Sequence, residues 1–150
     1  VLAVSTGSAY GDLDNDGDLD LVVSTVNSES LVFRNNTDTA NHASFSIALR
    51  SSEPNSLAVG AQVSIFQAGS QYTADNFTVR GYQSSVQNRI TIGVGSKNQR
   101  ADSVLVRWPE GDYSIHYDLP SNQIVELVKP ATEYLRTTAN VQTRSDSVLD

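Results

Sequence analysis

Apolar and polar residues alternate with a period of two in many short runs of this chain, and no run sustains the spacing of an amphipathic helix. A period of two is typical of half-buried β-strands, because successive side chains of a strand point to opposite faces. The sequence therefore predicts an all-β fold. The ten predicted strands cover residues 8–11, 20–26, 30–35, 44–50, 61–67, 75–80, 89–94, 103–108, 113–117 and 123–129.

The alternation also indicates which side chains face the core. Three strands each carry a row of apolar residues at every second position, and these rows are the predicted core. Gly69 and Gly111 lie in turns between predicted strands, and Gly111 is expected to have a positive φ in a hairpin. The core rows are Phe45, Ile47 and Leu49, then Ala61, Val63 and Ile65, then Val104, Val106 and Trp108.

Acidic residues are concentrated at one place in the chain. Residues 1–40 contain seven acids and one base, whereas residues 41–150 contain ten acids and nine bases. Five of the seven acids alternate along one short segment, so the acidity is a local feature and not a general solvating coat. These five aspartates are the predicted metal ligands: Asp12, Asp14, Asp16, Asp18 and Asp20.

The spacing of the aspartates fits a calcium-binding loop. Ca²⁺ takes about six to eight oxygen ligands, and a short loop supplies them by turning its odd-numbered side chains inward. Gly17 permits the sharp turn, and by analogy with related loops Asp18 offers its main-chain carbonyl while Asp20 closes the coordination sphere. An EF-hand does not fit, since Val23 stands where that loop needs a bidentate glutamate. Mg²⁺ is a weaker candidate, and the alternative without a metal is a solvated acidic turn.

The segment around these aspartates resembles a known repeat. Residues 7–36 read GSAYGDLDNDGDLDLVVSTVNSESLVFRNN, which closely resembles an FG-GAP/VCBS repeat, one blade of the integrin α-type β-propeller. The resemblance implies that the loop binds calcium between two strands. A propeller needs several blades, so this chain supplies at most a partial blade. That blade is cut from a longer protein, packed on the rest of this chain, or paired with strands of a neighbouring molecule.

A second resemblance covers the following residues. The ASPIC/UnbV module is similar to five segments, which read GAQVSIFQAG (60–69), FTVRGYQSS (77–85), ITIGVG (90–95), VLVRWPEG (104–111) and LPSNQIVELV (119–128). That module usually follows FG-GAP repeats in secreted or surface proteins, which implies an extracellular or cell-surface location. We therefore expect a calcium-binding β-hairpin or partial propeller blade at residues 1–40. An antiparallel β-sandwich is expected at 41–130, and a C-terminal tail at 131–150.

Several classes of function are disfavoured by composition. The chain has no cysteine and only two histidines, which excludes thiolate zinc sites and disulfide scaffolds. The acidic pI of about 4.6 argues against nucleic acid, and the apolar runs are too short to insert into a membrane. His42 and His116 are expected to be non-catalytic, and no cofactor-binding motif is present. The scattered tyrosines give no support for carbohydrate binding, while Asn35 and Asn76 match the glycosylation pattern.

Three hypotheses for function come from these observations. The first is a non-enzymatic, calcium-stabilised extracellular module that serves adhesion or protein–protein interaction. The alternative is a self-assembling structural subunit of an extracellular filament or surface layer, joined by exchange of a strand or of the tail. The third, a hydrolase that uses calcium as a Lewis acid, is disfavoured because the aspartates are needed as ligands.

Overall fold

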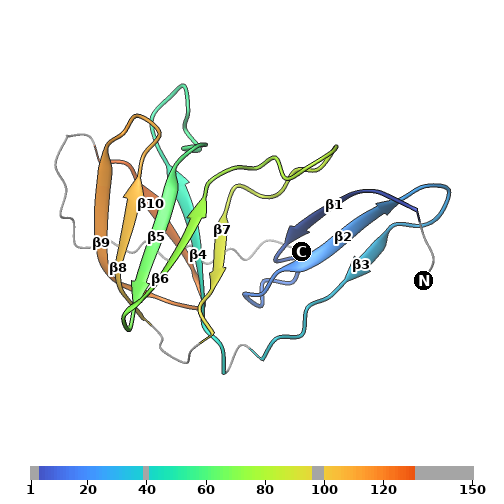
Figure 1. Cartoon of the computed structure of the whole chain (residues 1–150), viewed down its shortest axis with the longest axis horizontal. Helices are drawn as coiled ribbons and strands as arrows, with labels where there is room; N and C mark the ends of the chain where they lie inside the picture. Colours follow the sequence, from blue (N-terminus) through green and yellow to red (C-terminus); the bar gives the residue numbers. More distant parts are fainter. Residues whose placement is uncertain (1–3, 39–40, 96–99, 131–150) are drawn as a thin grey trace, which may run out of the picture.

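The structure is a computed structural model that describes residues 4–38, 41–95 and 100–130. Within these ranges ten strands form three sheets without any helix (Figure 1), which confirms the all-β prediction. A helix suited to crossing a membrane is accordingly not found in the described ranges. The strands are β1 (Ser5–Gly11), β2 (Asp20–Thr25), β3 (Leu31–Phe33), β4 (Ser44–Arg50), β5 (Gln62–Gln67), β6 (Ser70–Asp75), β7 (Ile90–Gly93), β8 (Arg100–Arg107), β9 (Tyr113–Pro120) and β10 (Ile124–Val128).

Two of the sheets share one apolar core and form a sandwich. Their strand orders are β10-β4-β7 and β6-β5-β8-β9. One pairing differs from the prediction, because β10 runs parallel to β4, with Val125 opposite Ile47, and the sandwich is therefore mixed. The chain crosses from β9 in one sheet to β10 in the other, and such a crossover lets two strands of one sheet run in the same direction.

The predicted core rows form the centre of this sandwich. Every residue of the three rows is buried, with an exposed fraction of 2% or less. The indole Nε1 of Trp108 donates a hydrogen bond of 3.1 Å to Ser114 Oγ, which lies 3.0 Å from Nε2 of His116. Trp108 is thus a core residue, and the polar groups that enter the core with it are hydrogen-bonded, as buried polar groups require.

Both predicted turns are confirmed. Ala68 and Gly69 have φ values of 48° and 80° and connect β5 to β6, the left-handed pair that suits a two-residue hairpin. Gly111 has a φ of 99° in the β8–β9 turn, where its amide donates to the carbonyl of Trp108.

The prediction of a strand at residues 75–80 is wrong. The tight turn at Gly69 starts β6 at Ser70, so β6 is already opposite the first residue of β5 when it reaches Asp75. The next residue, Asn76, is 3% exposed and donates hydrogen bonds of 2.9 Å to the carbonyls of Leu57 and Ala58. The main chain of Asn76 still bonds to the residues just before β5, since its amide donates to the carbonyl of Ala61 at 2.7 Å and its carbonyl accepts from the amide of Gly60 at 2.9 Å. The strand ends there because β5 offers no further residues to pair with, although the alternation of apolar residues continues.

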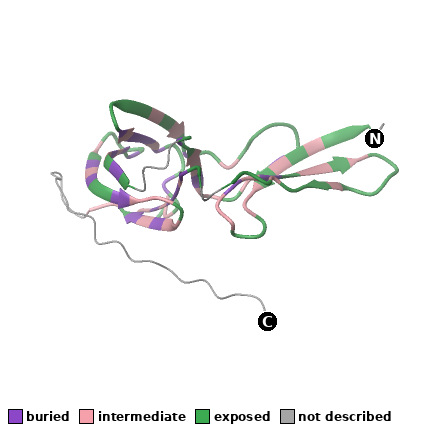
Figure 2. Cartoon of the chain, turned by 90° about the horizontal axis from the view of Figure 1, so that it is seen from below, coloured by how far each residue is buried: buried purple, intermediate pink, exposed green. Residues whose placement is uncertain are grey.

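The third sheet contains β1, β2 and β3 in antiparallel order and lies to one side of the sandwich (Figures 1 and 2). None of the apolar side chains described in this N-terminal sheet is buried, and Val32 and Phe33 of its edge strand are 65% and 50% exposed. Three strands need an apolar face packed against something to be stable in water. The N-terminal sheet therefore lacks a core of its own in this structure.

Among the described residues, hydrogen bonds join the N-terminal sheet and its β1–β2 loop to residues 41–130 at two places. The amide of Ser8 in β1 donates to Ser84 Oγ at 3.1 Å, and Ser44 Oγ in β4 donates to the carbonyl of Gly17 at 2.9 Å. The buried apolar cluster begins at Ala43, close to the predicted division at residue 40, and that division stays a prediction. The predicted C-terminal tail, 131–150, lies outside the described residues.

Candidate metal centre

The aspartate loop, residues 12–20, connects β1 to β2, and the base of the loop is closed by the pairing of Gly11 with Asp20. Two of its residues have a positive φ, Asn15 at 58° and Gly17 at 95°. Asn and Gly are the residue types that adopt this conformation at least cost. These two reversals curl the loop, so that side chains at alternate positions turn to the same side.

Three of the five predicted ligands come together on the inside of the loop. Asp12, Asp14 and Asp16 each offer one carboxylate oxygen, and these oxygens lie within 4.8 Å of one another. Oδ1 of Asp12 is buried and has no hydrogen-bond partner among the described residues. Carboxylates at this spacing repel one another, and a buried, unpartnered anionic oxygen is costly. The arrangement is chemically suited to a hard cation with oxygen ligands.

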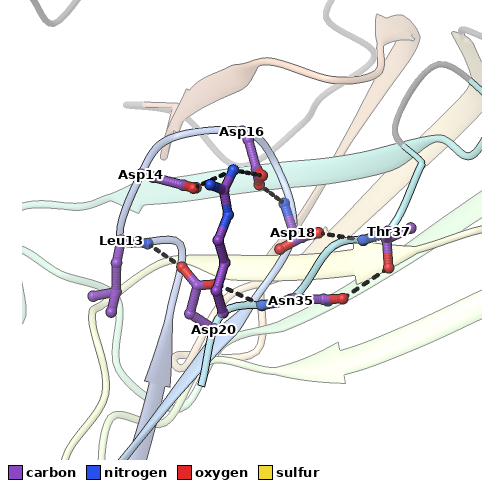
Figure 3. Close-up of polar contacts among 8 residues, drawn as sticks. Leu13, Asp14, Asp16, Asp18, Asp20, Asn35 and Thr37 are labelled. Carbon is purple, nitrogen blue, oxygen red and sulfur yellow. Dashed lines mark hydrogen bonds and ion pairs between the residues drawn. The ribbon is translucent and has the colours of Figure 1, made fainter. Parts of the chain in front are cut away.

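The side chains of Asp18 and Asp20 lie outside this group of three. Asp20 is 3% exposed, and its two oxygens accept hydrogen bonds from the amides of Leu13 at 3.0 Å and Asn35 at 2.9 Å (Figure 3). Asp18 is 8% exposed, and its Oδ2 accepts from the amide of Thr37 at 3.0 Å (Figure 3). Both carboxylates therefore attach the loop to the segment that follows β3.

The environment of Asp18 is unusual for a carboxylate. Burial raises the pKa of Asp18 above its ordinary value, and the hydrogen bond from Thr37 opposes this effect. The negative charges of Asp16, Asp20 and Asp14 raise the pKa of Asp18 further. The other oxygen of Asp18, Oδ1, is buried without a partner among the described residues. Positive charge within the loop would offset both the burial and the repulsion.

Arg34 supplies positive charge at the outer side of the loop. Its Nη2 lies 2.8 Å from Oδ2 of Asp14 and 3.5 Å from Oδ2 of Asp16. The Arg34 side chain is 65% exposed, whereas those of Asp14 and Asp16 are 36% and 30% exposed. Arg34 is therefore more exposed than the two carboxylates that it contacts.

Sequence reasoning did not find the groups from residues 34–37 that complete this site. The amides of Asn35 and Thr37 carry no signal in the sequence, because any residue type supplies a main-chain N–H. Arg34 did carry a signal, since residues 1–40 contain seven acidic residues and Arg34 is their single basic residue. An isolated base in an acidic segment is a reasonable candidate partner for the carboxylates.

A cavity of about 310 Å³ lies where the loop meets the sandwich. Gly17, Asp18 and Thr37 line it from the loop side, and Ser44 and Thr91 line it from β4 and β7. The hydrogen bond from Ser44 to Gly17 crosses this junction. A change in the conformation of the loop would therefore alter the contacts of Ser44 at the edge of the sandwich.

The other residues noted in the sequence lie away from the loop interior or are engaged elsewhere. His42 is exposed, and its Nδ1 lies 3.0 Å from the carbonyl of Asp38. His116 is buried in β9, and burial lowers the pKa of its imidazole. Of the two glycosylation matches, Asn35 is half-buried, whereas the amide nitrogen of Asn76 is already bonded to two carbonyls inside the protein.

Comparison with known proteins identifies the larger part of the chain. No curated protein matches the sequence. A family model described as ASPIC and UnbV matches residues 51–134, a span that includes β5 to β10 and lies beyond the aspartate loop. The match covers more than half of the chain, and the resemblance to the ASPIC/UnbV module is thereby confirmed. The protein belongs to the ASPIC and UnbV family.

Proposed function

We propose that the protein is a non-enzymatic β-module that binds calcium at the aspartate loop and is stabilised by it. In this proposal the module acts outside the cell or on its surface, in adhesion or another protein–protein interaction. The single observation that carries the proposal is the convergence of Asp12, Asp14 and Asp16. Their carboxylate oxygens lie within 4.8 Å of one another, and Oδ1 of Asp12 is buried without a partner among the described residues. The resemblance of residues 7–36 to an FG-GAP/VCBS repeat, as a partial propeller blade, supports it.

The ligand set follows from the positions of the five aspartates. Asp12, Asp14 and Asp16 would bind through their side chains, and Asp18 would offer its main-chain carbonyl, as in related loops. Asp20 accepts two amide hydrogen bonds, from Leu13 and Asn35, so its first contribution is to close the base of the loop. Water supplies the remaining ligands of such sites, since Ca²⁺ takes about six to eight oxygens.

The proposed role of calcium is structural. The N-terminal sheet buries no described apolar side chain, so it has little hydrophobic stabilisation of its own. Binding of an ion to the folded loop alone would stabilise the folded state by mass action. Extracellular calcium is concentrated enough to fill even weak sites, which is the reason for proposing an extracellular location.

The experiment that tests the proposal is calorimetric titration of the protein with CaCl₂ after treatment with chelator, combined with thermal unfolding in both conditions. Wild type is compared with Asp12→Asn, and with Glu29→Gln as a control that removes one acid outside the loop. We expect binding, and a rise of the melting temperature with calcium, in wild type and in the control. Absence of calcium binding by the wild-type protein would show that the loop is only an acidic turn.

A second candidate function is self-assembly into a filament or surface layer. The observation that favours it is the N-terminal sheet, in which β3 is an edge strand and in which Tyr10, Leu21 and Phe33 form one exposed row across the three strands. Open edges and exposed apolar faces are where strands of another molecule add. In this version calcium would stabilise the sheet that makes the contact.

Sedimentation over a range of protein concentrations separates the two candidates. Wild type is compared with Phe33→Thr, which removes an aromatic ring from the exposed row while keeping a residue suited to a strand. Mass that grows with concentration in wild type and not in Phe33→Thr supports assembly through this sheet. A parallel sample without residues 131–150 tests exchange of the tail. A wild-type protein that stays monomeric at every concentration excludes the assembling subunit.

A further inference from the structure

We infer that Arg34 is an internal counter-cation of the aspartate loop, which neutralises the carboxylates when calcium is absent and competes with calcium for them. This inference rests on the proposed calcium site and concerns the regulation of that site. Its starting point is the pair of contacts from Nη2 of Arg34, at 2.8 Å to Oδ2 of Asp14 and 3.5 Å to Oδ2 of Asp16. Both acids belong to the group of three that faces the loop interior.

The main chain fixes Arg34 next to the loop. Phe33, the residue before it, ends β3 and is paired with Leu21 of β2. Asn35, the residue after it, donates its amide to Oδ1 of Asp20 at 2.9 Å. Both neighbours of Arg34 are therefore bonded to the strand that begins where the loop ends. Because the main chain on both sides of Arg34 is already ordered, placing its guanidinium beside the carboxylates costs little additional backbone entropy.

The bonding of each carboxylate oxygen of Asp14 and Asp16 shows why Arg34 and a calcium ion would compete for the same groups. Oδ1 of Asp16 accepts the amide of Asp18 at 3.1 Å, so the oxygen that faces Arg34 is the remaining one of Asp16. Asp14 likewise gives Oδ2 to Arg34. A divalent ion inside the loop would draw on the same carboxylates and would be repelled by a guanidinium a few ångströms away.

Two effects of opposite sign follow when the charge of Arg34 is removed. Without calcium, the clustered carboxylates lose their only nearby described cation, and the loop becomes less stable. With calcium, the ion no longer meets a like charge, and it binds more tightly. A residue that merely positioned the carboxylates would act in one direction only, because its loss would weaken both the free loop and the calcium-bound loop.

The test compares wild type, Arg34→Gln and Arg50→Gln by calorimetric titration with CaCl₂ and by thermal unfolding in excess chelator. Arg50 is the matched control, since it is partly exposed, forms an ion pair of 3.2 Å with Glu126 and lies in the sandwich. We expect Arg34→Gln to bind calcium roughly tenfold more tightly than wild type and to melt at a lower temperature in chelator. Arg50→Gln should bind calcium as wild type does.

The outcomes separate this inference from the proposed function. If neither wild type nor Arg34→Gln binds calcium, the calcium site itself is wrong and the inference falls with it. If wild type binds and Arg34→Gln binds equally or more weakly, the calcium site stands and the competing role of Arg34 is refuted. A gain of equal size in Arg50→Gln would also refute it, because the effect would then come from net charge alone. Tighter binding by Arg34→Gln than by wild type, with Arg50→Gln unchanged, supports the inference.

Discussion

The hydroxyl of Ser44, in the first strand of the sandwich, donates a hydrogen bond of 2.9 Å to the main-chain carbonyl of Gly17, inside the aspartate loop. The two residues are separated along the chain by the whole of β2, β3 and the segment that connects them. Both residues line the cavity between the loop and the sandwich. It gives the loop a direct mechanical connection to strand β4.

Ser44→Ala should weaken this connection. Losing one partly buried hydrogen bond costs about 0.5–1.5 kcal/mol in free energy of unfolding. We expect hydrogen exchange of the β2 amides to become faster, while exchange of the β8 amides stays as in wild type. Ser46→Ala, in the same strand, provides the comparison, since Ser46 Oγ contacts Thr91 Oγ1 and not the loop. Equal changes in the two variants would mean that the loop does not depend on Ser44.

Asp16→Ala should weaken calcium binding and stability together. The substitution removes one of the three converging carboxylates and the acceptor of the Asp18 amide. We expect the dissociation constant for calcium to rise at least about tenfold, which corresponds to about 1.4 kcal/mol. The rise of melting temperature with calcium should shrink accordingly. Isothermal calorimetry and thermal unfolding check both parts, and an unchanged calcium affinity would remove Asp16 from the ligand set.

His116 should make the sandwich less stable as the solution becomes acidic. Burial lowers the pKa of His116 in the folded state, whereas the unfolded chain has the ordinary value of about 6.5. The unfolded state therefore binds more protons between these two pKa values. The stabilisation from the neutral imidazole is complete above about pH 6.5 and is lost as the pH falls toward the folded-state pKa, with a slope of at most about 1.4 kcal/mol per pH unit.

The measurement is denaturant unfolding between pH 5 and pH 8 for wild type and His116→Gln. Glutamine does not titrate, so the difference between the two proteins isolates the histidine from the clustered aspartates. The wild-type curve should fall relative to the variant below about pH 6.5. Parallel curves would show that His116 has the same pKa in the folded and unfolded states.

Asn76→Ala should destabilise the sandwich strongly for a polar substitution. The side chain is 3% exposed and donates to the carbonyls of Leu57 and Ala58 at 2.9 Å each. Each carbonyl keeps a second donor at 3.1 Å, Asn88 Nδ2 for Leu57 and the amide of Ala61 for Ala58. The expected cost is therefore that of two lost hydrogen bonds, at about 0.5–1.5 kcal/mol each. Chemical unfolding of Asn76→Ala beside Gln71→Ala, which changes an exposed side chain of β6, measures the difference. A loss below about 0.5 kcal/mol would mean that water replaces the amide.

The strands were predictable wherever side-chain alternation and burial agree. Phe45, Ile47 and Leu49 alternate in the sequence and are buried at 1% each, since one face of β4 meets the core. The pattern failed at residues 76–80, where apolar residues still alternate although the chain has left the sheet. The cause is the length of the partner strand, because Asp75 is already opposite Gln62, the first residue of β5, and this limit leaves no trace in local periodicity. The parallel pairing of β10 with β4 is equally invisible locally, because it depends on a crossover between sheets.

The sequence was enough to locate the aspartate loop, but it predicted only part of the geometry of the loop. Alternate spacing and the position of Gly17 were enough to bring Asp12, Asp14 and Asp16 together. The use of Asp20 as an acceptor for Asn35 depends on the return of the chain through β3, which spacing within the loop does not describe. Long-range main-chain partners of this kind have to be seen in three dimensions.

The parallel pairing of β10 with β4 also sets the order in which the protein can be completed during synthesis. Residues 124–128 form the strand beside Ser46–Arg50, so each paired residue of β4 is synthesised 78 residues before its partner in β10. Until that segment has left the ribosome, β4 has one neighbour instead of two and Ile47 and Leu49 are open at one side. A nascent chain that stops before residue 124 therefore has an unpaired edge at β4. Partly folded chains with unpaired strand edges are bound by chaperones, and they aggregate when no chaperone binds them.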